Sequence, residues 1–188
     1  DIEKIDDVRK LYTFTFKDPG TGLEVIYKAT EYLDFPAVEW VLNFKNHGKV
    51  DSPILENVQA LDVDISKKAE NKDCEYILYH TSGSLASKSD FTPIKDILRP
   101  LQSKKISSHG GRSSDDGGHS GMGKGGSFPF FDIAYDKEGV IFAVGWSGQW
   151  ATEFKRDNEK ALNVSAGMEL THLKLLPGEK IRTPRILM

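Results

Sequence analysis

Apolar and polar residues alternate along most of this chain. In the segment 37–45 every second residue is apolar, and these residues are Val38, Trp40, Leu42 and Phe44. A period of two is typical of a half-buried antiparallel strand, because successive side chains of a strand point to opposite faces. The chain is therefore predicted to consist mainly of strands.

The segments Leu11–Lys17 and Leu23–Thr30 alternate in the same way, and the short Gly-containing stretch Asp18–Gly22 separates them. Two alternating runs joined by a short loop with glycine predict an antiparallel hairpin. The same criteria predict further strands at Ile54–Ile65, Glu75–Thr81, Phe128–Tyr135, Val140–Trp146, Gln149–Arg156, Ala161–Ala166 and Glu169–Leu176.

A single short helix is expected, at Asp90–Leu98. Asp90 or Thr92 is a suitable cap, Pro93 falls in the first turn, and Pro100 ends the segment. Many short strands between turn residues predict an all-β fold. We expect one domain over residues 1–188, an antiparallel β-sandwich with at most one or two short helices.

The segment 104–127 interrupts this pattern with a long run rich in glycine and serine. Loops of this length are usually functional or disordered, and we expect a mobile one. It contains strings that match parts of nucleotide-binding motifs, but a strand-like run with Pro129 follows where such motifs need a helix. Its ligand-type residues, His109, Asp115, Asp116 and His119, have no common zinc spacing. No cofactor and no metal are predicted.

Composition narrows the functional class only a little. The 188 residues have a net charge of −3, which gives no electrostatic case for nucleic acid or an anionic membrane. There is no long apolar run of about 18 residues, so no membrane-spanning helix is expected. Cys74 is the only cysteine, which excludes a disulfide within the chain. If Asp1 follows a removed signal peptide, a secreted or periplasmic location is favoured.

Eight phrases resemble one known family, in the same order along the chain. They lie at 18–25 (DPGTGLEV), 35–48 (FPAVEWVLNFKNHG), 52–62, 89–94, 108–114 (SHGGRSS), 128–133 (FPFFDI), 139–150 (GVIFAVGWSGQW) and 167–187. Together they resemble the N-terminal β-sandwich of the glycoside hydrolase family 36 α-galactosidases. The resemblance implies a supersandwich like that of galactose mutarotase, followed by a catalytic (β/α)8 barrel beyond residue 188.

The same resemblance implies a role for the loop but no catalytic residue in this chain. The catalytic aspartates of the family lie on the barrel, so none is expected here. Arg112, Ser113 and Ser114 are expected to extend toward a sugar-binding pocket, where a guanidinium offers donors to hydroxyl groups. An equal alternative is that Arg112 only holds the loop in place.

The three tryptophans have different expected roles. Trp40 and Trp150 are predicted to lie in the core. If Ser147-Gly148 is the turn of a hairpin, Trp146 lies at its edge opposite Gln149. Trp146 is then a candidate for stacking on a sugar, with core or interface packing as the alternative.

The sequence therefore predicts a non-catalytic accessory domain of an α-galactosidase-like glycoside hydrolase. Its expected partners are the catalytic barrel of the same protein, a galactoside-type carbohydrate and, as an open option, further copies of itself. An apolar surface facing the barrel is expected to be exposed. The alternative is a freestanding carbohydrate-binding or protein-interaction β-sandwich.

Overall fold

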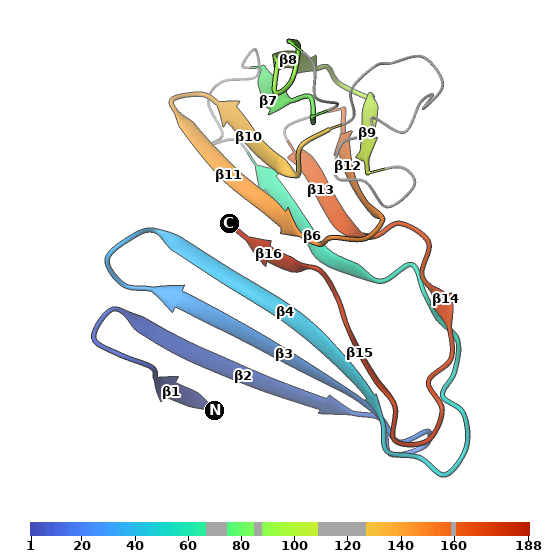
Figure 1. Ribbon diagram of the computed structural model, residues 1–188. Coiled ribbons are helices and arrows are strands. Elements are labelled where there is room, and N and C mark those ends of the chain that lie inside the picture. The colour runs from blue at the N-terminus through green and yellow to red at the C-terminus, as the bar shows by residue number, and fades with distance from the viewer. Residues whose placement is uncertain (67–74, 85–87, 109–126, 159–160) are drawn as a thin grey trace.

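The computed structural model describes residues 1–66, 75–84, 88–108, 127–158 and 161–188. These residues form sixteen strands and no helix (Figure 1). The strands are β1 (Ile2–Lys4), β2 (Arg9–Lys17), β3 (Leu23–Tyr32), β4 (Ala37–Asn46), β5 (Leu55–Glu56), β6 (Gln59–Ser66), β7 (Tyr76–Thr81), β8 (Pro93–Leu98), β9 (Ser103–Ser107), β10 (Phe130–Tyr135), β11 (Glu138–Gly145), β12 (Trp150–Arg156), β13 (Ala161–Met168), β14 (His172–Leu173), β15 (Lys180–Arg182) and β16 (Arg185–Leu187).

The strands form a large sheet, a small sheet and a separate two-stranded ladder. The large sheet has ten strands in the order β1-β2-β3-β4-β16-β11-β10-β7-β8, with β15 also pairing with β4. The small sheet has the order β6-β13-β12-β9, and β14 pairs with β5. All ladders between these strands are antiparallel. The predicted antiparallel β-sandwich is confirmed.

Aromatic residues fill the space between the two sheets. Phe131 and Phe142 of the large sheet stack with ring centroids 5.0 Å apart. Phe131 meets Trp150 and Phe154 of the small sheet edge-on, at 5.9 and 5.5 Å. Trp150 and Phe154 are fully buried, so the predicted core position of Trp150 is confirmed.

Three polar side chains cross from one sheet to the other. Trp40 Nε1 donates to the carbonyl of Ala60 at 2.7 Å, which confirms Trp40 as a core residue. The Tyr76 hydroxyl donates to the carbonyl of Ile65 at 2.6 Å. Arg156 Nη1 donates to the carbonyl of Leu98 at 2.6 Å. Because a buried polar group without a partner is costly, these bonds fix how the sheets face each other.

The part of the large sheet made by β1–β4 projects beyond the small sheet (Figure 1). On the face of this wing that contains Trp40, Tyr27 lies between Phe14 and Trp40, with ring centroids 5.8 and 6.5 Å away. Trp40 is buried, whereas Phe14 and Phe16 are 48% and 63% exposed. The small sheet therefore covers one half of the large sheet and leaves the outer wing open.

Strand β16 connects this wing to the rest of the large sheet. Its central residue, Ile186, lies opposite Trp40 of β4 and Val144 of β11 and is fully buried. The main chain of Met188 also exchanges two hydrogen bonds with Val38, at 2.8 and 2.9 Å. The end of the chain therefore pairs with β4 as β15 and with both β4 and β11 as β16.

The predicted hairpin at residues 11–30 is confirmed as β2 and β3. Lys17 lies opposite Glu24, and the main-chain amide of Gly22 donates to the carbonyl of Asp18 at 2.8 Å. Gly22 has a φ of 76°, and a Cβ there would lie 2.6 Å from the amide nitrogen of Gly48. Glycine is therefore required by both the backbone conformation and the space.

The helix predicted at Asp90–Leu98 is wrong. Phe91 has a φ of 55°, which breaks a right-handed helix, and β8 begins two residues later and pairs with β7. Pairing with an existing strand outweighs a weak local helix propensity. The loop predicted from residue 104 also begins too early, because β9 lies opposite β12 as far as Ser107.

Three further boundaries differ from the prediction. The strand expected at 54–65 is divided into β5 and β6 by Asn57, which has a φ of 51°. Only His172 and Leu173 form a strand within 169–176, and His172 Nδ1 lies 3.0 Å from Glu56 Oε2. The hairpin considered around Ser147-Gly148 does not form, because β11 and β12 belong to different sheets.

We expect Ile186→Ala to lower the free energy of unfolding by about 2–5 kcal/mol, since it opens a cavity between the wing and the sandwich. Urea denaturation followed by tryptophan fluorescence measures this effect. Leu187→Ala is the matched control, because Leu187 is 39% exposed on the opposite face of the same strand and its replacement costs less. Equal losses from the two substitutions would contradict the connecting role of Ile186.

Candidate functional site

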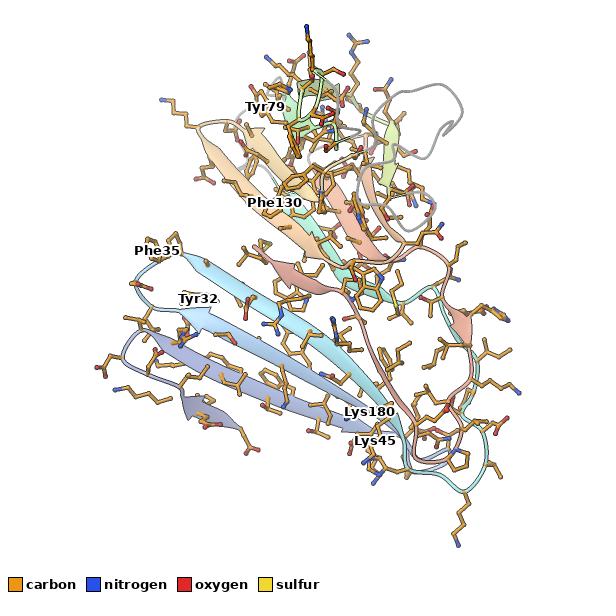
Figure 2. All side chains as sticks on the ribbon, in the orientation of Figure 1. Tyr32, Phe35, Lys45, Tyr79, Phe130 and Lys180 are labelled. Carbon is orange, nitrogen blue, oxygen red and sulfur yellow. The ribbon has the colours of Figure 1, made fainter. Side chains whose placement is uncertain are left out.

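An apolar groove of about 660 Å³ opens beside the end of β16, between β4 and β11. On one side it is formed by the β3–β4 connection, on the other by the β10–β11 hairpin (Figure 2). Its lining residues with large apolar side chains include Tyr32, Phe35, Phe130, Ile141, Leu187 and Met188. Phe35 and Ile141 are 66% and 65% exposed, so this surface is open to solvent. The expected exposed apolar surface is therefore present.

The alternation within β10 and β11 explains why the groove is apolar. Phe131 and Phe142 lie opposite each other and point into the core, so their neighbours Phe130 and Ile141 point outward. Phe128 stacks on Phe130 at 4.9 Å and extends the aromatic surface. The place of this apolar surface was not predicted, although the adjacent Phe130 and Phe131 were a usable signal. Two successive apolar residues in one strand must occupy opposite faces.

The described residues that line this groove offer mainly apolar contacts. Glu31 is the one charged residue in its lining, and its carboxylate accepts a hydrogen bond from the Tyr12 hydroxyl at 2.7 Å. That bond raises the pKa of Tyr12. Among the described residues, no second carboxyl group lines the groove, whereas glycoside hydrolysis uses a pair of acids.

Trp146 lies at the other end of β11, at the connection to the small sheet. It is half-buried, and the guanidinium of Arg182 lies 5.0 Å from the centre of its ring. A Cβ at Gly148 would lie 2.7 Å from the indole nitrogen, so the ring also packs closely on Gly148. The structure shows Trp146 in contact with a cation and the main chain, and its role in sugar stacking stays a prediction.

The other predicted site residues, Arg112, Ser113 and Ser114, lie outside the described residues. The residues that flank this segment belong to different sheets. Ser108 follows β9, and its hydroxyl accepts from the amide of Trp150 at 3.0 Å and donates to the carbonyl of Gly148 at 3.1 Å. Ser127 forms an isolated bridge with Ser82, next to β7. The chain therefore enters the predicted loop within a few residues of Trp146.

A buried histidine forms a polar cluster where the edges of the two sheets meet. His80 Nε2 lies 2.8 Å from Asp96 Oδ2, and Lys104 Nζ lies 2.7 Å from the same oxygen. Burial lowers the pKa of His80, although the bond to Asp96 opposes this shift. Burial alone raises the pKa of Asp96, but Lys104 and His80 outweigh it and lower this pKa overall. Because Lys104 is on β9 and Asp96 on β8, the cluster links the sheets.

The described part of the chain contains no group of three acidic, histidine or cysteine residues arranged to hold a metal ion. Within the same residues, no helix is long and apolar enough to cross a membrane.

Comparison with solved structures identifies the architecture. An α-galactosidase of family GH36 from Geobacillus stearothermophilus superposes with a TM-score of 0.74 at 19% identity, over 96% of this chain and 23% of that one. The α-galactosidase from Lactobacillus brevis gives a TM-score of 0.75 at 19% identity, over 98% and 23%. This chain has the fold of one part of the GH36 α-galactosidases. The resemblance seen in the sequence phrases is confirmed at the level of the fold.

Two more comparisons define the extent of the match. The galactosidase domain of an α-galactosidase-sucrose kinase gives a TM-score of 0.74 at 15% identity, over all of this chain and 24% of that one. The chain thus spans about a quarter of the length of the enzymes it matches. A putative aldose 1-epimerase from Escherichia coli gives 0.50 at 11% identity. No family model and no curated protein matches the sequence.

We expect the free energy of unfolding to decrease as the pH is lowered from about 7 to about 5. The reason is that His80 is protonated at a higher pH in the unfolded chain than in the folded chain, where burial lowers its pKa. A lowered folded-state pKa means that the stabilisation is complete above the ordinary histidine pKa and is lost as the pH falls. The lowered pKa of Asp96 stabilises the folded chain fully above the ordinary value of 3.8, and this stabilisation is lost only as the pH falls below that value. Urea titrations at several pH values measure the slope.

The variant His80→Gln is expected to flatten this slope. His172→Gln is the matched control, since His172 lies on an exposed strand, and it should leave the slope in place. A slope that survives in His80→Gln would show that another group is responsible.

Proposed function

We propose that this chain is the non-catalytic β-sandwich of an α-galactosidase-like glycoside hydrolase and packs against the catalytic barrel of the parent protein. The observation that supports this proposal best is the extent of the structural match. Nearly all of this chain superposes, but on only 23% of the GH36 enzymes. A freestanding module is not favoured by a match of this kind.

The apolar groove is the surface we assign to the barrel. The exposed side chains of Phe35, Phe130 and Ile141 gain about 25 cal/mol for each Å² of apolar area removed from water. A contiguous exposed apolar patch marks an interaction site more often than scattered apolar residues do. Since the groove lacks a pair of acids, it serves contact between domains, and catalysis belongs to the barrel.

The predicted loop residues complete this proposal. Crystal structures of variants of the Geobacillus enzyme contain stachyose or raffinose. By analogy, a galactoside is the ligand class of the parent protein. Arg112, Ser113 and Ser114, which follow Ser108 closely in the chain, would then approach the sugar together with Trp146. The loop supplies one edge of the pocket, and the barrel supplies the rest.

We expect the isolated chain to show no hydrolysis of an aryl α-galactoside above background and to bind galactose more weakly than about 1 mM, which corresponds to about 4 kcal/mol. One edge of a pocket leaves most of the sugar in water, whereas ligand sites bury most of the ligand surface. A chromogenic assay and titration calorimetry provide the two measurements. Micromolar binding of galactose would instead support a freestanding carbohydrate-binding module, and turnover would overturn the non-catalytic assignment.

We also expect the isolated chain to self-associate at high concentration through the uncovered groove. Sedimentation velocity of Phe130→Ser should show weaker association than the parent chain, because the substitution removes an aromatic side chain from the groove. Phe16→Ser is the matched control, since Phe16 is 63% exposed on the wing, away from the groove. If Phe16→Ser weakens association as much as Phe130→Ser, the groove is not the contact surface.

A further inference from the structure

A second groove, of about 590 Å³, lies on the outward face of β3, β4, β15 and β16. Its lining contains five cationic residues, Lys28, Lys45, Lys180, Arg182 and Arg185. None of its lining residues is acidic. The whole chain has a net charge of −3, so this groove is a local reversal of the overall charge.

Two lysines of this groove face each other directly, where β15 pairs with the end of β4. Lys45 of β4 is the cross-strand partner of Lys180 of β15, and Figure 2 shows them side by side. Opposite residues of an antiparallel pair have Cβ atoms about 5 Å apart, and like charges at such positions are destabilising. The strand pairing thus holds two positive charges together at a cost in stability.

The described part of the chain gives these lysines no ion-pair partner within 4 Å. Neither Lys45 nor Lys180 forms an ion pair with a described residue, and the same holds for Lys28. Glu24 is the partner of Lys45 on β3, but its Oε1 lies 2.9 Å from His47 Nε2. The groove therefore keeps unpaired positive charge on a concave surface, where it attracts anions.

The two arginines are held in place by contacts that leave donors available. The guanidinium of Arg182 lies on the Trp146 ring and donates through Nη1 to the carbonyl of Thr183 at 3.1 Å. Arg185 Nη1 is paired with Glu39 Oε1. A guanidinium has five N–H donors, so both residues keep donors for a ligand. An arginine that is already oriented loses less side-chain entropy when it binds an anion.

The floor of the groove adds apolar and polar surface to these charges. Ile26 and Val41 supply apolar area, and Asn43, which lies opposite Arg182, supplies an amide. A Cβ at Gly145 would lie 3.2 Å from the carbonyl oxygen of Arg185, so glycine leaves room beside that residue. The volume is within the usual range of small-ligand sites, about 300–1,000 Å³.

We propose that this groove binds a small anionic ligand through a carboxylate or phosphate group placed between Lys45, Lys180 and Arg182. The anion relieves the repulsion between the two lysines, and the amide and apolar floor contact the remainder of the ligand. The site is separate from the apolar groove and does not depend on the proposed function. Only the use of an acidic saccharide as a probe rests on that function.

Titration calorimetry with the full chain tests the proposal with four probes: inorganic phosphate, digalacturonate, the neutral disaccharide melibiose and a hexapeptide of glutamates. We expect digalacturonate or phosphate to bind with a Kd below 1 mM at low salt, and melibiose to bind at least tenfold more weakly. Tighter binding of digalacturonate identifies an acidic saccharide as the source of the anion, and equal binding of phosphate identifies the free anion.

The variant Lys45→Gln/Lys180→Gln is expected to weaken binding of the anion at least tenfold. It also removes the like-charge pair, so its thermal unfolding temperature should be no lower than that of the parent chain, which excludes misfolding as the cause. The matched control, Lys88→Gln/Lys137→Gln, removes the same charge from two exposed lysines outside the groove and should leave the Kd unchanged. Equal weakening by both variants, no binding of either small anion, or preference for the glutamate peptide would overturn the proposal.

Discussion

The architecture depends on a three-residue strand at the end of the described chain. Strand β16 lies between β4 and β11 and joins a wing of four strands to the half of the sheet that forms the sandwich. Ile186 belongs to the core on both sides, because Trp40 and Val144 are its cross-strand partners. These residues are far apart in the sequence, so closing this contact costs chain entropy that only the buried interface repays. The wing and the large-sheet half of the sandwich are therefore parts of one continuous sheet.

Both grooves follow from this arrangement. Because β16 is shorter than β4 and β11, the neighbouring surfaces beyond its end diverge, and the apolar groove opens there beside Met188. Before β16, the chain already runs along β4 as β15, which places Lys180 opposite Lys45. The segment that contains β15 and β16 therefore borders both grooves. The apolar groove lies beside the end of β16, and the cationic groove lies along β15. Under the two proposals, the apolar surface receives a protein domain and the cationic surface receives a small anion.

The polar clusters among the described residues hold parts of the fold together. The cluster of His80 with Asp96 and Lys104 joins the edges of the two sheets and is explained by that structural role. Trp146 supports Arg182 with its ring, which connects a residue expected to touch sugar with the cationic groove. In the function proposed above, the chain contributes surfaces to a larger protein, and the chemistry belongs to the domain to which it is joined.

The sequence by itself predicted most of the longer strands, because the period of two and the turn residues are local properties. The hairpin around Gly22 and the strand that contains Trp40 were predicted for this reason. Tertiary structure decided which strands are neighbours, and local signals misled there. Thr92 and Pro93 resemble a helix start but lead into β8, since pairing with β7 outweighs helix propensity. The grooves could not be predicted, because Phe130 and Lys180 gain their neighbours only when distant strands pair.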